Sequence, residues 1–227
     1  MSKGLKLGAF EIFWLDGGVF ELDGGCMFGV VPRALWQKKF PCTADGYIKL
    51  TNSPILVRTP GADLIIDSGL GNKLTAKQKK IFRVSREWDV EGSLARLGLT
   101  RVDIDHVILT HCDFDHSGGI VMENRSGEAE LTWPNAVHHL QREEWQDVVM
   151  PNRRAAGTYW PINLDLLGDH HLLNLLDGEV EPVPVRGGEG AEVGRGTPDD
   201  GPPRVVGRDR FTWAICCQIT PTSIPCG

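Results

Sequence analysis

Short apolar runs separated by turn residues fill the first third of the chain. "GAFEIFWLDGG" and "GGVFELDGG" each end in Asp-Gly-Gly, which is typical of a hairpin turn. "DGYIKLTNSPILVRTPGADLIIDSG" repeats the pattern, and Pro54 and Pro60 mark the boundaries between its apolar runs. These runs predict strands, and "ADLIIDSGLG" predicts a short buried strand that ends at Asp67 and a glycine turn.

Helical and strand patterns alternate in the middle of the chain. "TAKQKKIF", with Thr75 as its N-cap, and "DVEGSLARLGL", closing on Gly98, predict helices. "DHVILTH" predicts another buried strand, and "AELTWP" and "AVHHL" predict two more. "QREEWQDVVM" predicts a helix, whereas "NLDLLGDHHLLNLL" is mixed. After about Pro182, Gly, Pro and Arg dominate, so we expect one domain over residues 1–183 and a disordered tail over 184–227.

Composition narrows the class of protein. The 227 residues are 41% hydrophobic, which suits a globular chain with a core, and the net charge of -6 comes without any basic run. Nucleic acid is therefore not expected as a non-specific partner. The N-terminus lacks the pattern of a signal peptide and no apolar run is long enough to span a membrane, so we expect a cytoplasmic protein. The six cysteines form no disulfide framework and are expected to be reduced thiols.

The stretch "ILTHCDFDHSGG" carries the candidate chemistry. His111, Asp113, Asp115 and His116 are four metal-type ligands within six residues, behind a predicted buried strand and ahead of a glycine pair. In a loop they form two pairs, which suits two neighbouring metal ions that could activate a water molecule and polarise a carbonyl or phosphoryl oxygen. The glycines at 118–119 would let a helix start directly against the metals.

"THCDFDHSGG" resembles the His-x-His-x-Asp-His signature of the metallo-β-lactamase superfamily, and "LIIDSGLG" is similar to that superfamily's strand ending in Asp-x-Gly. The resemblance extends over about residues 7–183. It implies an α+β fold, an αβ/βα four-layer sandwich with metals at one edge, whose C-terminal half is incomplete in this chain. "GGVFELDGG" and "VHHLQREEW" are most similar to the branch that hydrolyses N-acyl-homoserine lactones and related esters.

The resemblance also implies roles for individual residues. His111 and Asp113 would hold the first metal ion, and Asp115 and His116 the second. Asp115 would in addition orient the attacking hydroxide, and Asp67 would fix a ligand histidine. Asp113 departs from the signature, which has a histidine there. We expect two divalent ions, with zinc first, and the carboxylate shifts the preference toward manganese or iron.

The other histidines and the aromatic residues are expected to be mostly structural. His138 and His139 lie in an apolar run typical of a strand, and His106 precedes a strand and is expected to be exposed. His170 and His171 suit either the surface or a substrate pocket. The remaining candidates fit the core or the wall of a pocket: Trp145, Tyr159 and Trp160.

Three further ligands of the superfamily follow the motif: a His in a Gly-His-Thr turn, a bridging Asp and a final His. No histidine follows His171 in this chain. With suitable synonymous codons, the coding sequence of Trp213–Gly227 read two bases out of frame supplies an apolar-flanked Gly-Asp and a later His. We therefore hypothesise that the segment after about Pro184 is a frameshifted superfamily C-terminus. The alternative is a natural disordered extension.

The function expected from the resemblance is metal-dependent hydrolysis, in which a metal-bound hydroxide attacks a small-molecule lactone or ester. A homodimer is compatible with it, and no membrane or nucleic-acid partner is expected. Three alternatives remain: an inactive remnant that binds at most one metal, a glyoxalase-type thioesterase, and a di-iron protein that handles oxygen or nitric oxide. The missing ligands favour low activity in this chain.

Overall fold

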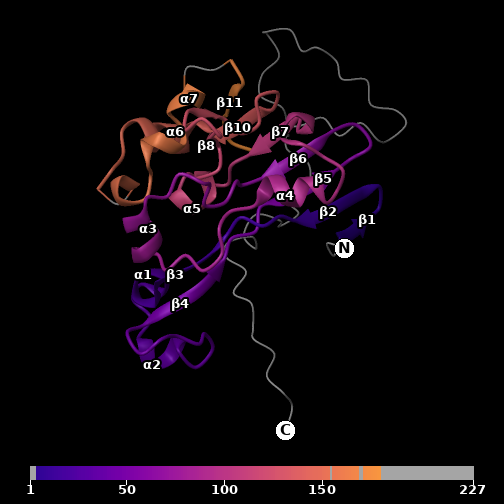
Figure 1. The fold of residues 1–227 in the computed structure, drawn as a ribbon. Helices are drawn as coiled ribbons and strands as arrows, with labels where there is room; N and C mark the ends of the chain where they lie inside the picture. The colour runs from indigo at the N-terminus through magenta and orange to yellow at the C-terminus, as the bar shows by residue number, and fades with distance from the viewer. Residues whose placement is uncertain (1–3, 154, 169–170, 180–227) are drawn as a thin grey trace.

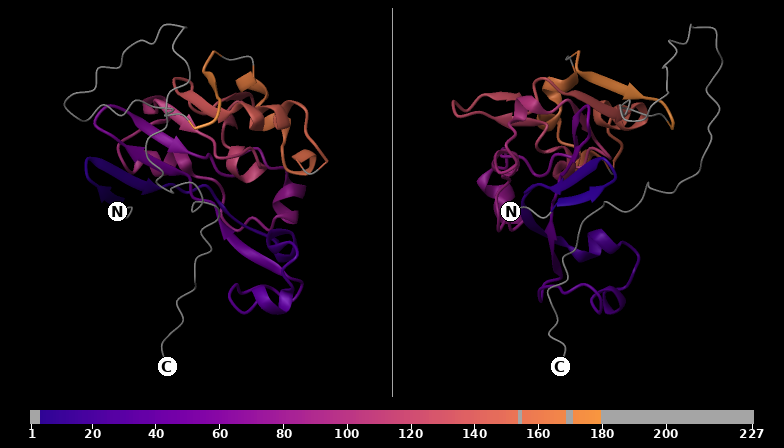
Figure 2. Two further views of the ribbon diagram at one scale, coloured as in Figure 1. Left: turned by 180° about the vertical axis from the view of Figure 1, so that it is seen from behind. Right: turned by 90° about the vertical axis from the view of Figure 1, so that its right-hand side faces the viewer.

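The computed structural model describes residues 4–153, 155–168 and 171–179. A seven-stranded sheet crosses the upper part of the molecule, and an arm built from two strands and two short helices extends below it in every view (Figures 1 and 2). The fold is a mixture of α and β structure, which confirms the predicted α+β class. The boundary predicted at 183–184 and the tail lie outside the described residues.

The large sheet is half antiparallel and half parallel. Its order is β1-β2-β5-β6-β7-β10-β11. Neighbouring strands from β1 through β2 and β5 to β6 pair antiparallel, and neighbouring strands from β6 through β7 and β10 to β11 pair parallel. Its strands are β1 Gly4–Leu7, β2 Phe10–Trp14, β5 Ile55–Arg58, β6 Asp63–Ile66, β7 His106–Ile108, β10 Val137–Gln141 and β11 Leu173–Leu176. The strands of the two-stranded sheets are β3 Val19–Asp23 with β4 Tyr47–Thr51, and β8 Val121–Glu123 with β9 Ala129–Leu131.

The helices are short, and Asp23, Thr75 and Asp89 cap three of them. They are α1 Gly24–Phe28, α2 Arg33–Trp36, α3 Ala76–Ile81, α4 Val90–Ala95, α5 Phe114–Ser117, α6 Arg142–Val149 and α7 Asp165–Gly168, with 3-10 turns at Arg101–Asp103, Ala155–Gly157 and Pro161–Asn163. Thr75 caps α3 in a reciprocal capping box with Gln78, as the sequence predicts. Even the longest described helix, α6, has eight residues, and none in the described part is long and apolar enough to cross a membrane.

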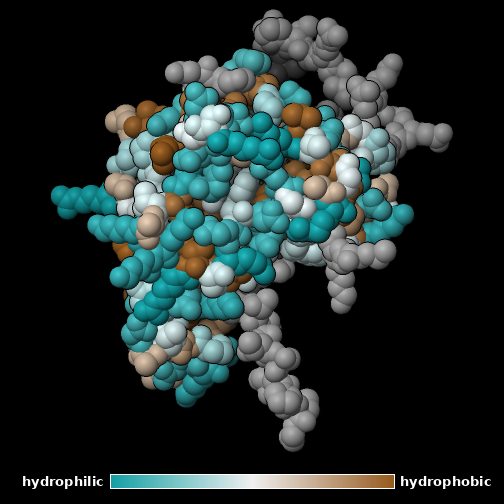
Figure 3. Space-filling model, viewed as in Figure 1, coloured by the Kyte–Doolittle hydropathy of each residue, from teal (hydrophilic) through white to brown (hydrophobic). Residues whose placement is uncertain are grey.

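One face of the large sheet forms the main core. Leu56, Ile65, Val107 and Leu140 are at most 1% exposed, because side chains from α4, α6 and α7 cover them. The other face is covered less completely, and Leu5, Leu7 and Trp14 are between 38 and 59% exposed. Polar residues dominate the surface seen in Figure 3, and the apolar residues on it form small separate groups.

The Asp-Gly-Gly turns are not hairpin turns, and this expectation was wrong. Residues 10–23 pair with residues 47–58 along one long bent ribbon: Val19 faces Thr51, and Trp14 faces Ile55. Four residues (15–18) on one strand therefore lie opposite three (52–54) on the other, so the first Asp-Gly-Gly adds one residue, as in a β-bulge, and bends the ribbon from the arm into the sheet. In the second Asp-Gly-Gly, Asp23 accepts a hydrogen bond from the Cys26 backbone N–H (3.0 Å) and caps α1.

His106 is half-buried, and the expectation that it is exposed was wrong. In the parallel pairing of β7 with β10 its Nδ1 lies 3.0 Å from Nε2 of His139, and Asn174 Nδ2 lies 3.0 Å from His139 Nδ1. His138 and His139 are both buried in β10, which agrees with a structural role. Because the Asn174 amide nitrogen can only donate, His139 carries its proton on Nε2 and donates it to His106. His170 lies outside the described residues.

The sheet core predicts a large cost for removing one central side chain. Ile65→Ala should lower the free energy of unfolding by about 2–4 kcal/mol, because it leaves a cavity at a fully buried position. Leu7→Ala, which removes a similar side chain at a position that is 59% exposed, is the matched control and should cost under about 0.5 kcal/mol. Urea unfolding monitored by circular dichroism measures both, and equal losses would contradict this assignment of the core.

The contact of His106 with the buried His139 predicts that acid lowers the stability of the protein. Burial and the neighbouring His106 lower the pKa of His139 to about 4, below its ordinary value of 6.5. The unfolded chain therefore binds the proton more readily, so this stability is present above about pH 6.5 and is lost as the pH falls toward 4. We expect the free energy of unfolding to drop by on the order of 2 kcal/mol more between pH 7.5 and 4.5 in the wild type than in His139→Gln. The same pH dependence in both proteins would show that His139 does not contribute it.

Candidate metal centre

The candidate ligands lie where two neighbouring parallel strands end. β6 and β7 pair in parallel, with Ile66 opposite Ile108, so their carboxyl ends meet at one edge of the sheet. Asp67 directly follows β6, and its backbone N–H donates to the Ile108 carbonyl (2.9 Å). The motif follows β7. This edge is the usual place for a ligand site in a parallel sheet, because the strands hold the loops rigidly.

Asp67 joins the two strand ends through its side chain. Its backbone lies in the left-handed region, with φ of 57°, a conformation that Asp adopts more readily than most residues, and the residue is 5% exposed. The carboxylate accepts hydrogen bonds from the Thr110 backbone N–H (2.9 Å), the Thr110 hydroxyl (2.8 Å) and the His116 Nδ1–H (2.9 Å). Three polar contacts to the motif thus hold Asp67 in this strained backbone conformation.

These contacts fix the protonation of both motif histidines. An ionised carboxylate only accepts, so His116 must be protonated on Nδ1. The Thr110 hydroxyl gives its single proton to Asp67 and therefore accepts from Nδ1–H of His111, 3.0 Å away. In the neutral form of each imidazole the lone pair is therefore on Nε2, which is the form that binds a metal ion.

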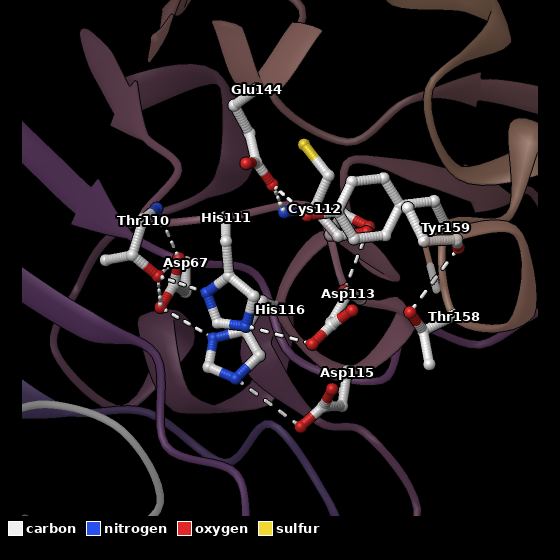
Figure 4. Close-up of polar contacts among 12 residues, drawn as sticks. Asp67, Thr110, His111, Cys112, Asp113, Asp115, His116, Glu144, Thr158 and Tyr159 are labelled. Atoms are coloured by element: carbon white, nitrogen blue, oxygen red, sulfur yellow. Dashed lines mark hydrogen bonds and ion pairs between the residues drawn. The ribbon is translucent and has the colours of Figure 1, made fainter. Parts of the chain in front are cut away.

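Nε2 of each histidine faces one carboxylate of the motif (Figure 4). His111 Nε2 lies 3.4 Å from an Asp113 oxygen, and His116 Nε2 lies 3.5 Å from an Asp115 oxygen. The two imidazole rings lie next to each other, with centroids 3.9 Å apart. The structure therefore brings the four predicted motif residues together as two His–carboxylate pairs, with Asp67 behind His116.

Both pairs have a separation that fits a metal ion. Two ligand atoms at the usual distance of about 2.1 Å from a tetrahedral zinc ion lie about 3.4 Å apart, close to the 3.4 and 3.5 Å observed. Each pair supplies two ligands. Within the described part of the chain, no group of three or more His, Cys, Asp or Glu residues could surround one ion. The pairs fit two partial metal sites.

The two carboxylates differ in their electrostatic surroundings. Asp115 is buried, and burial raises its pKa above the ordinary value. Burial also raises the pKa of Asp113, but hydrogen bonds from His111 and Thr158, with the charges of His111 and His116, outweigh it, so the pKa is lowered. A divalent cation nearby would offset the cost of holding Asp115 as a buried anion.

The glycine pair serves close packing, and the helix predicted after it was misplaced. Helix α5 lies inside the motif and ends just before Gly118, and strand β8 follows the pair. A Cβ at Gly118 would lie 2.3 Å from the Leu70 carbonyl oxygen, and one at Gly119 would lie 2.5 Å from that of Ser68. The glycines are needed because the loop after β6 packs directly against their backbone.

Several side chains that hold the motif were not predicted from the sequence. Asn52 donates to the Asp115 backbone carbonyl, and the Lys73 ammonium donates to the carbonyls of Gly118 (2.6 Å) and Val121. Burial lowers the pKa of Lys73 to about 8. Glu144 accepts from the backbone N–H of Cys112 (2.7 Å). These residues lie far from the motif in the sequence and have no pattern of their own, so only the fold identifies them.

The described cysteines agree with the expectation of free thiols. Cys26, Cys42 and Cys112 form no disulfide, and the other three lie outside the described residues. Burial raises the pKa of the Cys112 thiol far above its ordinary value, with smaller contributions from Glu144, Asp67 and Asp113. Although Cys112 lies inside the motif, its thiol is neutral and fully buried, which does not favour a thiolate ligand.

Comparison with solved structures finds the same fold in metal-dependent enzymes. A probable metal-dependent hydrolase from Staphylococcus aureus is 38% identical, with a TM-score of 0.71 over 79% of this chain and 63% of that one. The dizinc quorum-quenching lactonase AidC, with the product N-hexanoyl-L-homoserine, is 23% identical, with a TM-score of 0.58 over 78% of this chain and 61% of that one. An N-acyl homoserine lactone hydrolase with the same product at its catalytic metal centre is 17% identical, with a TM-score of 0.53 over 81% and 63%.

This chain thus spans somewhat less than two thirds of the length of these similar structures. No curated protein sequence matches it. Residues 49–191 match the model of the metallo-beta-lactamase superfamily, and this segment contains Asp67 and the whole motif. On that match, over more than half of its length, the chain belongs to the metallo-beta-lactamase superfamily.

Proposed function

We propose that this protein is a metal-dependent hydrolase that opens a small lactone or ester of the acyl-homoserine lactone type. The observation that carries the proposal is the arrangement of the motif as two His–carboxylate pairs, in which an imidazole Nε2 lies 3.4 or 3.5 Å from a carboxylate oxygen. Two adjacent pairs suit a two-metal centre better than a single ion. Family membership supports the same reaction class.

In this proposal His111 and Asp113 hold one ion, and His116 and Asp115 hold the other. Zinc is the first choice of metal, and the oxygen ligand of Asp113 makes manganese or iron competent as well. Bound ions of this kind lower the pKa of water and polarise a carbonyl oxygen. Asp67 keeps His116 in its ligand form, and Asp115 would also accept a hydrogen bond from the attacking water and orient it.

The substrate class rests on similarity of fold and on family. The lactonases that share the fold are 17 to 23% identical, and two of them contain the ring-opened product N-hexanoyl-L-homoserine. A lactone and its open-chain ester need the same attack at a carbonyl carbon, so we propose both as substrates. A cytoplasmic location, a homodimer, and the absence of nucleic-acid and membrane partners complete the proposal.

A second candidate is a metal-binding protein without turnover. Catalytic zinc sites have three protein ligands, whereas each pair supplies two within the described residues. A chain with only these ligands would hold a metal ion weakly, and the proposed frameshift of the segment after about Pro184 would account for the loss. Resequencing the codons for residues 182–227 tests that origin: a restored open frame with Gly-Asp and His supports it, and an unchanged frame contradicts it.

Metal binding and hydrolysis together test the proposal. We expect the purified chain, dialysed against zinc or manganese, to retain metal, and His111→Ala and His116→Ala to retain less, because each removes one of the two ligands in its pair. Glu128→Ala, at an exposed carboxylate away from the motif, is the control. Metal content is measured by mass spectrometry, and ring opening of hexanoyl-homoserine lactone by alkali uptake.

Each outcome points to one function. Metal binding with lactone opening supports the lactonase, whereas cleavage of a glutathione thioester in its place supports a glyoxalase-type enzyme. Metal binding without any turnover supports the inactive metal-binding protein. Equal metal content in the wild type and both histidine variants would contradict the proposed ligands.

Asp67 should matter both for folding and for metal binding. Asp67→Ala removes the acceptor of three hydrogen bonds at a buried position, so we expect the free energy of unfolding to fall by about 2–4 kcal/mol. We also expect metal affinity to fall about 10–100-fold, because His116 loses its orientation. Asp67→Asn keeps one acceptor oxygen and should lose less of both. Urea unfolding and metal titration provide the measurements, and an unchanged metal affinity in Asp67→Ala would remove Asp67 from the site.

A further inference from the structure

Three consecutive residues outside the motif contact it either directly or through Glu144. Thr158 forms a side-chain hydrogen bond with Asp113. The Tyr159 hydroxyl donates to Glu144, and the Trp160 ring stacks on Phe114, with centroids 4.6 Å apart and planes 17° apart. The segment therefore lies next to the place where Glu144 reaches the motif (Figure 4).

Glu144 connects this segment to the motif backbone. One oxygen of its carboxylate, Oε1, accepts both the Tyr159 O–H and the Cys112 backbone N–H, the latter at 2.7 Å. Hydrogen bonds to a charged acceptor are about twice as strong as neutral ones. The Tyr159 hydroxyl thus holds in place the oxygen that binds Cys112, and burial together with Glu144 raises the pKa of Tyr159, which keeps it a proton donor.

The helix that carries Glu144 is itself firmly placed. Helix α6 follows β10 without a break, and Trp145 and Val148 pack against the main core. At its first residue, Arg142 binds Asp177 through two nitrogen–oxygen contacts of 2.8 and 2.9 Å. The position of the Glu144 carboxylate is therefore set by the sheet and the core rather than by the loop that it contacts.

Cys112 is the residue between the two ligands of the first pair. Its backbone N–H is bound by Glu144, and its carbonyl accepts a hydrogen bond from the Ser117 hydroxyl (3.0 Å). The peptide planes on both sides of Cys112 are thereby fixed. These planes set the directions in which the side chains of His111 and Asp113 leave the backbone, and so help to set their separation of 3.4 Å.

We propose that Glu144, held by Tyr159, is a positioning residue that fixes the spacing of the His111–Asp113 ligand pair through the Cys112 backbone. This inference rests on the proposed metal-binding function. Glu144 holds the backbone between the two ligands, so its effect is indirect. Supporting residues of this kind typically change metal affinity about 10–100-fold when they are removed.

Three variants separate positioning from a general role in folding. Glu144→Ala removes the acceptor, Glu144→Gln keeps an Oε1 that can accept both hydrogen bonds, and Glu143→Ala removes an exposed carboxylate from the same turn of α6 as the matched control. The first readout is hydrogen exchange of the Cys112 amide measured by NMR, relative to the Ile65 amide at the centre of the sheet. The second is zinc affinity from competition with a chelating dye.

We expect Cys112 exchange to accelerate at least about tenfold relative to Ile65 in Glu144→Ala, because the amide loses its acceptor, and zinc affinity to fall about 10–100-fold. Glu143→Ala should match the wild type in both, and Glu144→Gln, which keeps a neutral acceptor, should lose much less of each than Glu144→Ala. If Glu144→Ala fails to fold, Tyr159→Phe replaces it; it leaves Glu144 in place but unheld, and should accelerate Cys112 exchange without affecting Ile65.

Unchanged Cys112 exchange, or equal acceleration at Ile65, would overturn the positioning role. So would weakened zinc binding that Glu144→Gln does not rescue. Failure of the proposed function is recognised separately: a wild-type chain that binds no zinc contradicts metal binding, while Cys112 exchange still reports whether Glu144 fixes the loop.

Discussion

The carboxylate of Asp67 is the contact on which the candidate site depends. It ends β6 in a left-handed backbone conformation and binds the Thr110 backbone, the Thr110 hydroxyl and His116. Through these three contacts one buried anion aligns two strand ends and sets the protonation of His116 directly and of His111 through Thr110. An ionised acceptor at this point binds the Nδ1 side of the motif, so that Nε2 of both imidazoles faces the motif carboxylates.

Two cores meet at the motif and limit how it can move. The main core lies under the sheet and reaches Cys112. The second core joins the β3–β4 arm to Phe114, and the ring centroids of Phe114 and Phe20 are 6.1 Å apart. Between them the loop after β6 packs on Gly118 and Gly119 without space for a side chain. Ligand residues on short loops between packed elements are held in position by the fold, which is the condition for a preorganised site.

The sequence predicted what local patterns determine. The strands ending at Asp67 and before Thr110, the Thr75 cap and the clustering of the motif residues all follow from periodicity, capping and spacing. It did not predict what depends on distant partners. The first Asp-Gly-Gly is a bulge only because residues 10–23 pair with residues 47–58, and Glu144 matters only because α6 lies against Cys112. The tail and its proposed downstream ligands lie outside the described residues, so that part stays a prediction.

X-ray absorption spectroscopy of the zinc-loaded protein tests most directly whether the motif is a metal centre. If the two His–carboxylate pairs bind zinc, the spectrum should show nitrogen and oxygen neighbours at about 2.0–2.2 Å together with the outer-shell scattering of imidazole. With both positions filled, a second metal at about 3.5–4 Å should add its own signal. A spectrum of oxygen neighbours alone, without imidazole scattering, would mean that zinc binds elsewhere on the surface, and would contradict the account.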